Sequence, residues 1–212
     1  MTNADSALPT TAMLEILDQT YPEAHCELEF ANPFQLLIAT ILSAQCTDQK
    51  VNRVTSRLFA YYPNPVDIVR LGQAGLEEEI KQLGLFRTKA KNIITTCRIL
   101  LDQFKGTVPV DRAHLEALPG VGRKTANVVL ANAFGIPAIA VDTHVFRVAK
   151  RLGLAGGETV RQVEDQLMAH IPPMYWIKTH HLLIWHGRRI CLARKPKCPI
   201  CPLANLCPSV TG

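Results

Sequence analysis

The sequence of 212 residues is poor in aromatic side chains, at 6%, and has no apolar run close to the roughly 20 residues of a membrane-spanning helix. The polar start from Met1 to Ser6 lacks the basic and apolar regions of a secretory signal peptide. No Asn-Gly or Asp-Gly pair marks a β-hairpin turn. These absences argue against a membrane protein, a secreted protein and a hairpin-rich fold, and we expect a cytoplasmic protein.

The charge excess is small, with 23 basic against 18 acidic residues and a net charge of +5. It permits an anionic partner without requiring one, because proteins that bind no nucleic acid often carry a similar excess. The length suits one large domain or two small ones. Seven cysteines in a reducing compartment are not expected to form disulfides, so a cluster among them indicates metal or redox chemistry.

Helix signals dominate the sequence. Asn32, Asn64 and Asp111 are each placed to cap a helix, and in the first two cases proline follows at the first helical position. Gln35 is placed for a capping box with Asn32. Apolar residues recur with helical spacing after these caps, and only residues 138–141 resemble a short strand. We predict an all-α protein.

Residues 118–126 read Leu-Pro-Gly-Val-Gly-Arg-Lys-Thr-Ala, with two glycines in a tight turn and a lysine in the helix that follows. Gly120 and Gly122 allow positive φ and close backbone approach, and the unpaired amides of the next helix suit a DNA phosphate. Lys124 would lie at the positive end of the helix dipole, which disfavours its charged form and favours a nucleophilic amine. The alternative is an ordinary helix-turn-helix connection with a solvated lysine. Residues 82–90 repeat the pattern faintly, with Gly84 in the place of Gly120, as short helix connections often do.

The C-terminal segment contains four cysteines in the pattern C-x6-C-x2-C-x5-C, namely Cys191, Cys198, Cys201 and Cys207. Intervening prolines keep the segment out of regular helix, so that its turns can surround a metal centre. Four thiolates can bind either zinc or a 4Fe-4S cube. A single close pair of cysteines, rather than two, favours iron-sulfur. Arg194, Lys195 and Lys197 lie between the first two cysteines and can contact phosphates, or else form a solvated basic face.

Taken together, residues 118–126, Val141-Asp142-Thr143-His144 and the cysteine pattern resemble the endonuclease III family of DNA base-excision glycosylases, within the helix-hairpin-helix superfamily. The resemblance extends from about Asn32 through Leu42-Ser43-Ala44-Gln45 and Gly84-Leu85 to Cys207. It implies a two-lobed helical fold with a 4Fe-4S cluster loop, in which DNA is held against the cleft between the lobes. One lobe would be a six-helix bundle at residues 26–136, with the hairpin. The other would combine residues 1–25 with 137–212, including an N-terminal helix around residues 11–20.

The family removes oxidised or ring-saturated pyrimidines and then cuts the strand. By resemblance, the amine of Lys124 attacks C1′ of the damaged nucleotide, expels the base and forms a Schiff base that permits β-elimination. Asp142, the family's carboxylate, stabilises the positive charge on the sugar and relays protons. Without a lysine partner, Asp142 would be read as a helix cap. His144 receives no catalytic role.

Removing a base requires flipping it out of the duplex. The resemblance implies that Gln45 fills the vacated space, that Leu85 wedges into the opposite strand, and that Ser43 and Asp48 line the lesion pocket. The hairpin residues Gly120, Val121 and Gly122 would contact the phosphate backbone. Each of the first four has an ordinary alternative, as a surface amide for Gln45, a core residue for Leu85 and local caps for the other two. The three remaining cysteines, Cys26, Cys46 and Cys97, match no cluster position and are expected to pack as small apolar residues.

The implied partner is damaged double-stranded DNA, bound by a monomer that associates with the bacterial nucleoid rather than with a membrane. One rival is the adenine glycosylase branch, which lacks the lysine and carries a further C-terminal domain, whereas this sequence has Lys124 and ends five residues after Cys207. The other rival is a non-enzymatic DNA-binding module with a hairpin and a zinc ribbon.

Overall fold

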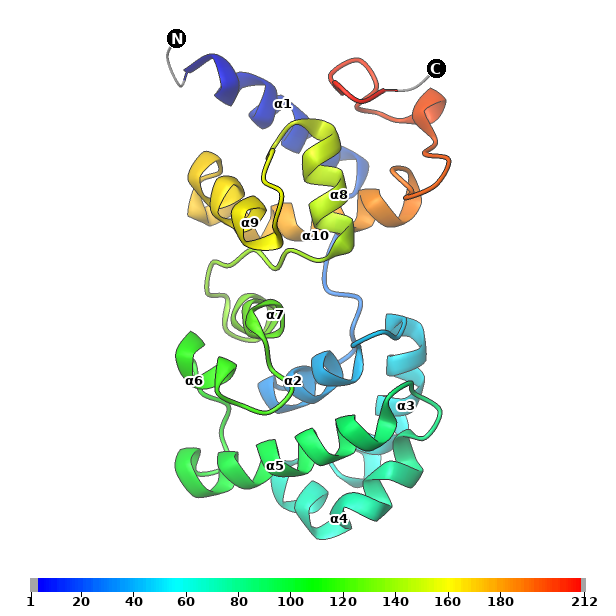
Figure 1. Cartoon of the computed structure of the whole chain (residues 1–212), viewed down its shortest axis with the longest axis vertical. Helices are drawn as coiled ribbons and strands as arrows, with labels where there is room; N and C mark the ends of the chain where they lie inside the picture. Colours follow the sequence, from blue (N-terminus) through cyan, green and yellow to red (C-terminus); the bar gives the residue numbers. More distant parts are fainter. Residues whose placement is uncertain (1–3, 211–212) are drawn as a thin grey trace. The chain divides into compact units, whose positions relative to one another are not determined.

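The computed structural model describes residues 4–210, with side chains from Thr10 onward, so part of the predicted polar start lies outside the described residues (Figure 1). Every regular element in that range is helical, which confirms the all-α prediction. The short strand predicted at residues 138–141 is wrong. These four residues run without regular structure and are buried, because their apolar side chains pack among helices and no neighbouring strand pairs with them. None of the described helices is long and apolar enough to cross a membrane.

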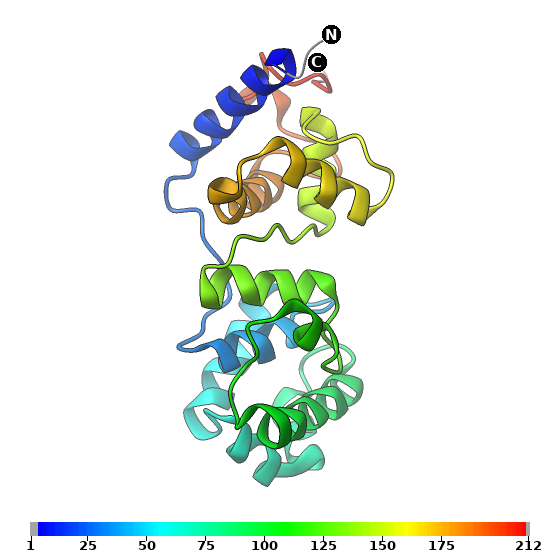
Figure 2. The ribbon, with the colours of Figure 1, turned by 90° about the vertical axis from the view of Figure 1, so that its left-hand side faces the viewer.

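The chain forms two compact units, Cys26–Ile136 and Met1–His25 together with Pro137–Gly212. The first unit has α2 at its centre, and the side chains from Phe34 to Leu42 are all buried. Around it, α7 and α3 pack against α2, and α5 lies alongside α4 (Figures 1 and 2). The helices of this unit are α2 (Pro33–Leu42), α3 (Asp48–Tyr61), α4 (Pro65–Ile80), α5 (Phe86–Phe104), α6 (Arg112–Glu116) and α7 (Arg123–Phe134).

The three predicted helix caps are present in this unit. The side chains of Asn32, Asn64 and Asp111 each accept a hydrogen bond from the third residue of the helix that follows. The Gln35 side chain differs in detail from a capping box, because it accepts from the Ala31 amide rather than from that of Asn32. A kink at Gly72, where φ is 75°, interrupts α4 and was not predicted.

The second unit packs α10 against α8 and α1. Its core includes Leu17, Val148, Val163 and Leu183, which are fully buried. The elements of this unit are α1 (Ala4–Thr20), α8 (Thr143–Leu152), α9 (Val160–His170), η1 (Pro173–Tyr175), α10 (Trp176–Arg189) and η2 (Cys198–Ile200).

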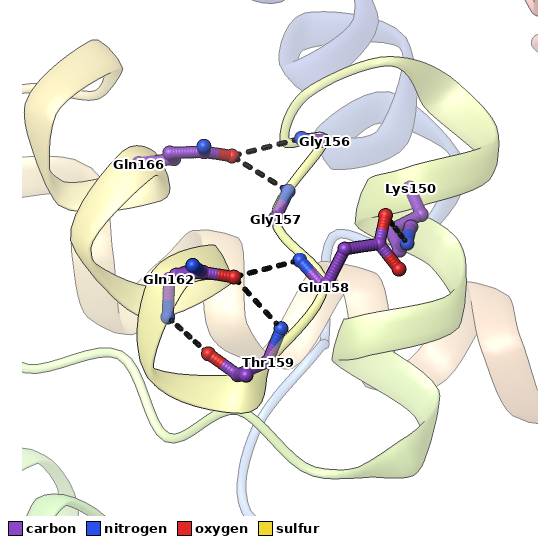
Figure 3. Close-up of polar contacts among 7 residues, drawn as sticks. All are labelled: Lys150, Gly156, Gly157, Glu158, Thr159, Gln162 and Gln166. Atoms are coloured by element: carbon purple, nitrogen blue, oxygen red, sulfur yellow. Dashed lines mark hydrogen bonds and ion pairs between the residues drawn. The ribbon is translucent and has the colours of Figure 1, made fainter.

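Two glutamines of α9 organise the connection from α8 (Figure 3). Gln166 Oε1 accepts from the amides of Gly156 and Gly157, at 2.8 and 2.9 Å. Gln162 closes a capping box with Thr159, the N-cap of α9. Gly157 must be small, since a Cβ there would lie 2.6 Å from Cβ of Gln162, whereas a Cβ at Gly156 would meet nothing within 4 Å.

Candidate functional site

The helix-hairpin-helix turn connects α6 to α7. Gly120 has a φ of +81°, and a Cβ there would lie 3.0 Å from Nδ2 of Asn92 in α5. Glycine is therefore required at this position by both backbone and space. Gly122 has an extended backbone, with φ at −95°, and a Cβ there would meet nothing within 4 Å. Its missing side chain leaves the start of α7 open to an approaching group.

Three amides around the start of α7 face no acceptor in the part of the chain that the structure describes. The first bond of the helix runs from the Ala126 amide to the Gly122 carbonyl at 2.9 Å, and the amides of Gly122, Lys124 and Thr125 have no partner among residues 4–210. Val121 is different, because its side chain is 5% exposed and its amide donates to the Leu118 carbonyl. Val121 thus shapes the turn from within, while the amides around it remain available to an anion.

Lys124 is the second residue of α7 and its side chain is exposed. Its amine makes no ion pair or hydrogen bond with any residue that the structure describes. The neighbouring Arg123 pairs instead with Glu116, at 3.9 Å. An exposed amine with no bound carboxylate can approach a carbon electrophile, provided that it is deprotonated.

Gln45 and Leu85 share an unusual backbone. Their φ values are 56° and 59°, in the left-handed region that non-glycine residues seldom adopt. Such conformations cost on the order of 1 kcal/mol each and concentrate at functional sites. Gln45 is exposed, and Leu85 is 56% exposed, so Leu85 is not a core residue. The turn at residues 82–90 therefore places its left-handed residue at Leu85, not at Gly84, and differs from the Gly120 turn.

Ser43 and Asp48 flank the Gln45 turn. Ser43 is the C-cap of α2, and its hydroxyl donates to the Thr40 carbonyl at 2.8 Å. Asp48 is the first residue of α3, whose N-cap is Thr47. Both residues are half-buried. Their backbone positions fix the two ends of the turn that presents Gln45.

Asp142 is the N-cap of α8 and belongs to the other unit. Its Oδ1 accepts from the amides of His144 and Val145, both at 2.8 Å. Its Oδ2 has no hydrogen-bond partner in the described part of the chain. One carboxylate oxygen thus fixes the side chain, and the other accepts no hydrogen bond from the described residues. His144 contacts Arg147 at 3.3 Å, and burial lowers its pKa, which agrees with a packed histidine.

The four cysteines of the C-terminal segment line one cavity of about 180 Å³, with His186 and Leu152 also in its wall. Burial raises the pKa of the Cys201 thiol, and the other three thiols raise it further, because four sulfurs gather in one place. No three of the described His, Cys, Asp and Glu side chains are arranged to hold a single metal ion. A sulfur-lined cavity of this size suits a multi-atom cluster.

Two arginines of α8 hold this segment. Arg147 donates to the carbonyls of Gly187 and Cys191, at 2.8 and 3.0 Å. Arg151 donates to the carbonyls of Leu192 and Ala193 and lies 3.5 Å from Sγ of Cys191. Sequence reasoning missed both arginines. The sequence offered one sign of them, because two arginines four residues apart lie on the same face of a helix and can act on the same segment.

His186 in the cavity wall was not predicted from the sequence, whereas the cations of the loop between Cys191 and Cys198 were. His186 approaches Cys201 Sγ at 3.7 Å and Tyr21 Oη at 3.1 Å, and sequence reasoning did not select it. The predicted cations Arg194, Lys195 and Lys197 are all exposed on the loop between the first two cysteines, with Lys195 left-handed at a φ of 50°. The loop therefore presents three cations to solvent.

Two of the three remaining cysteines differ in their surroundings, and the third, Cys26, is half-buried. Cys97 is fully buried, and this burial raises its pKa to about 12, as expected for a packed thiol. Cys46 is half-buried and accepts a hydrogen bond from Lys89 at 3.3 Å, so it is not simply apolar packing.

Comparison with known proteins identifies two family matches. The model of the HhH-GPD superfamily base excision DNA repair protein matches residues 38–173, and that of the iron-sulfur binding domain of endonuclease III matches residues 191–207. Endonuclease III of Escherichia coli (strain K12) is 52% identical over 195 residues, 92% of each chain. That of Bacillus subtilis (strain 168) is 50% identical over 195 residues, covering 92% of this chain and 89% of the relative.

Solved structures give the same result. A trapped endonuclease III-DNA covalent intermediate matches with a TM-score of 0.91 and 50% identity, over 99% of this chain and 97% of that one. A thermostable thymine-DNA glycosylase, at 24% identity, covers 96% of this chain and 97% of its own with a TM-score of 0.84, which shows a common fold.

Proposed function

The chain belongs to the endonuclease III family within the HhH-GPD superfamily of base excision DNA repair proteins, and from this premise we propose how its residues act on damaged DNA. It is a bifunctional DNA glycosylase and AP lyase with a 4Fe-4S cluster. Its substrates are oxidised or ring-saturated pyrimidines in duplex DNA. It acts as a monomer, in the cytoplasm at the nucleoid.

The nucleophile is Lys124, and the observation that carries this assignment is its exposed amine, which pairs with none of the described residues, beside the open amides of α7. The deprotonated amine attacks C1′ of the damaged nucleotide, the C1′–N bond breaks, and the base departs with a proton. The C1′–O4′ bond of the sugar ring then breaks, O4′ takes up a proton, and the resulting iminium between C1′ and the amine acidifies the C2′ proton. Its loss expels the 3′ phosphate and cleaves the strand. A relative at 50% identity has been trapped as a covalent intermediate with DNA, which supports a covalent route.

Asp142 is the partner carboxylate. The hydrogen bonds to Oδ1 hold the side chain in place, so that Oδ2 keeps a fixed direction. The carboxylate therefore needs no reorganisation energy at the moment of reaction. Negative charge there stabilises the sugar cation, and the oxygen can accept a proton during the reaction and return it.

The left-handed turns present the two residues that probe the duplex. Gln45 fills the space left by the flipped nucleotide, and Leu85 enters the opposite strand. Ser43 and Asp48 line the lesion pocket at the two ends of the Gln45 turn. The open amides of Gly122, Lys124 and Thr125, which follow the Gly120 turn, receive a backbone phosphate, and Val121 keeps the turn in shape.

The cluster is held by the four cysteines Cys191, Cys198, Cys201 and Cys207. The cavity that they line has room for it, and the iron-sulfur match favours it over the zinc alternative. When bound, the cluster ties the loop together and can exchange an electron. The loop then presents Arg194, Lys195 and Lys197 to phosphates.

Borohydride trapping on an abasic duplex tests the nucleophile. Wild-type protein should form a stable cross-link and Lys124→Gln should form none, while Lys91→Gln, at another exposed lysine of the same unit, should cross-link normally. Cross-linking by Lys124→Gln at the wild-type level would overturn the assignment.

Substrate class is tested with duplexes that contain thymine glycol, dihydrouracil, an abasic site, 8-oxoguanine, or adenine opposite 8-oxoguanine. Cleavage of the first three supports the proposal. Cleavage confined to the 8-oxoguanine duplex would overturn the pyrimidine assignment, and excision of adenine without a cross-link would favour the adenine glycosylase rival.

A further inference from the structure

Lys89 is a buried cation, and no carboxylate among the side chains that the structure describes pairs with it. It lies in α5 one turn after Leu85 and is 4% exposed. Its Nζ donates to Sγ of Cys46 at 3.3 Å, and within residues 4–210 this sulfur is its only polar partner. A buried ammonium is costly without a strong acceptor, because it has given up its hydration. The Lys89 side chain therefore depends on its hydrogen bond to the Cys46 sulfur.

Cys46 follows Gln45, and its amide donates to the Ser43 carbonyl at 3.0 Å, which closes the turn. The Lys89 amide donates to the Leu85 carbonyl at the same distance, so the first turn of α5 begins at Leu85. The Lys89–Cys46 contact therefore links the two left-handed turns that present Gln45 and Leu85. Cys46 is half-buried, so that part of this residue, unlike the fully buried Cys97, is open to a small molecule.

We propose that Cys46 is a site of reversible oxidation by hydrogen peroxide, promoted by Lys89, which weakens DNA binding by separating the Gln45 turn from α5. The sulfur attacks one peroxide oxygen, so that an S–O bond forms and the O–O bond breaks. The departing hydroxide takes a proton from the Lys89 ammonium and leaves as water. Lys89 is then reprotonated by the proton that the Cys46 thiol has lost to solvent. In sum, one thiol and one peroxide give one sulfenic acid and one water.

Lys89 supplies a proton donor directly beside the sulfur, as this step requires. The sulfenic acid then changes the contact between Lys89 and Cys46. An oxygen on Sγ that accepts from the ammonium needs a hydrogen bond of about 2.8 Å in addition to the S–O bond. At an S–O···N angle wider than a right angle, the sulfur and the nitrogen lie farther apart than the 3.3 Å that now separates them. Oxidation is therefore expected to push the Gln45 turn away from α5.

Five of the other six thiols differ from Cys46 in their surroundings. Cys97 is fully buried with a pKa raised to about 12, so it is protected from peroxide. The four C-terminal cysteines line the cluster cavity. The contrast between Cys46 and Cys97 gives an internal control in a single sample.

The first test is chemical and needs no DNA. The cluster-loaded protein is treated with peroxide and dimedone, and adducts are located by mass spectrometry while visible absorbance reports the cluster. We expect an adduct at Cys46 and none at Cys97. Lys89→Met, which removes the proton donor but keeps the bulk, should slow labelling of Cys46 by about 100-fold, the lower end of general-acid effects. Labelling at an unchanged rate, or none at Cys46 in wild type, would overturn the proposal.

The second test measures affinity for an abasic duplex and rests on the proposed function of Gln45 and Leu85. Peroxide should weaken wild-type binding by about fivefold or more, in the usual range of coupling between sites, and dithiothreitol should restore it. Cys46→Ser keeps an acceptor for Lys89 but cannot form a sulfenic acid, so its affinity should not respond to peroxide. An equal loss in Cys46→Ser would refute the link to DNA binding. Because borohydride trapping by untreated protein reports Lys124 independently, failure here is distinguishable from failure of the proposed function.

Discussion

Asp142 has two roles that substitution can separate. It caps α8 through Oδ1, and we propose that Oδ2 serves the reaction. Asparagine keeps an oxygen to accept from the amides of His144 and Val145 but removes the negative charge. Alanine removes both. The two variants should therefore differ in stability and agree in their loss of activity.

The expected sizes follow from the two contacts. Loss of a capping oxygen costs about 1 kcal/mol of unfolding free energy. Loss of a carboxylate at the positive end of a helix dipole costs about 0.5 kcal/mol. Asp142→Ala should therefore lower the unfolding free energy by about 1.5 kcal/mol, and Asp142→Asn by about 0.5 kcal/mol. Both variants should lose cleavage activity by at least about 100-fold, because the charge and the proton-accepting oxygen are gone.

Thermal or urea unfolding measures the stability change, and single-turnover cleavage of a thymine glycol duplex measures activity. Thr159, which caps α9 in the same unit, provides a matched control. Thr159→Ala should lose about 1 kcal/mol of stability and keep its activity. If Asp142→Asn cleaved at the wild-type rate, the carboxylate would have no chemical role. If it were as unstable as Asp142→Ala, the capping argument would be wrong.

Three further outcomes are expected. Gly157→Ala should destabilise the protein by about 1–3 kcal/mol in urea unfolding, because its Cβ would press against Gln162, whereas Gly156→Ala next to it should change little. Leu17→Ala should lower unfolding free energy by about 2–5 kcal/mol, since this side chain is fully buried, and a loss below 1 kcal/mol would contradict its place in the core. Iodoacetamide at pH 8 should leave Cys97 unmodified in the native protein, because its pKa is raised to about 12, and peptide mapping that finds it alkylated would disprove this.

Local sequence signals predicted local structure well. Asn32, Asn64 and Asp111 cap the helices that they were expected to begin, because capping depends on the side chain and the next three residues alone. The strand predicted at residues 138–141 was wrong, since a short apolar run has the same sequence pattern whether it pairs with a strand or is buried among helices. Which of these occurs depends on neighbours that lie far away in the chain.

In the candidate site, too, the sequence predicted local features but not contacts between distant residues. Its order of motifs was visible in the sequence, as were the hairpin, Asp142 as a cap and the spacing of the cysteines. The arginines that hold the cysteine loop were not, because Arg147 and Arg151 meet its carbonyls 40 or more residues away. Nor was the left-handed backbone of Gln45 and Leu85, which no propensity favours.

The sequence by itself determined the helices, their caps, the glycine that the hairpin needs and the set of thiols, because each is decided within a few residues by backbone sterics or side-chain chemistry. Only the tertiary structure decided which oxygen of Asp142 is engaged, that the four thiols share one cavity, and that a buried lysine ends at Cys46. Distances between remote side chains follow from packing, and packing is a property of the whole fold rather than of any segment.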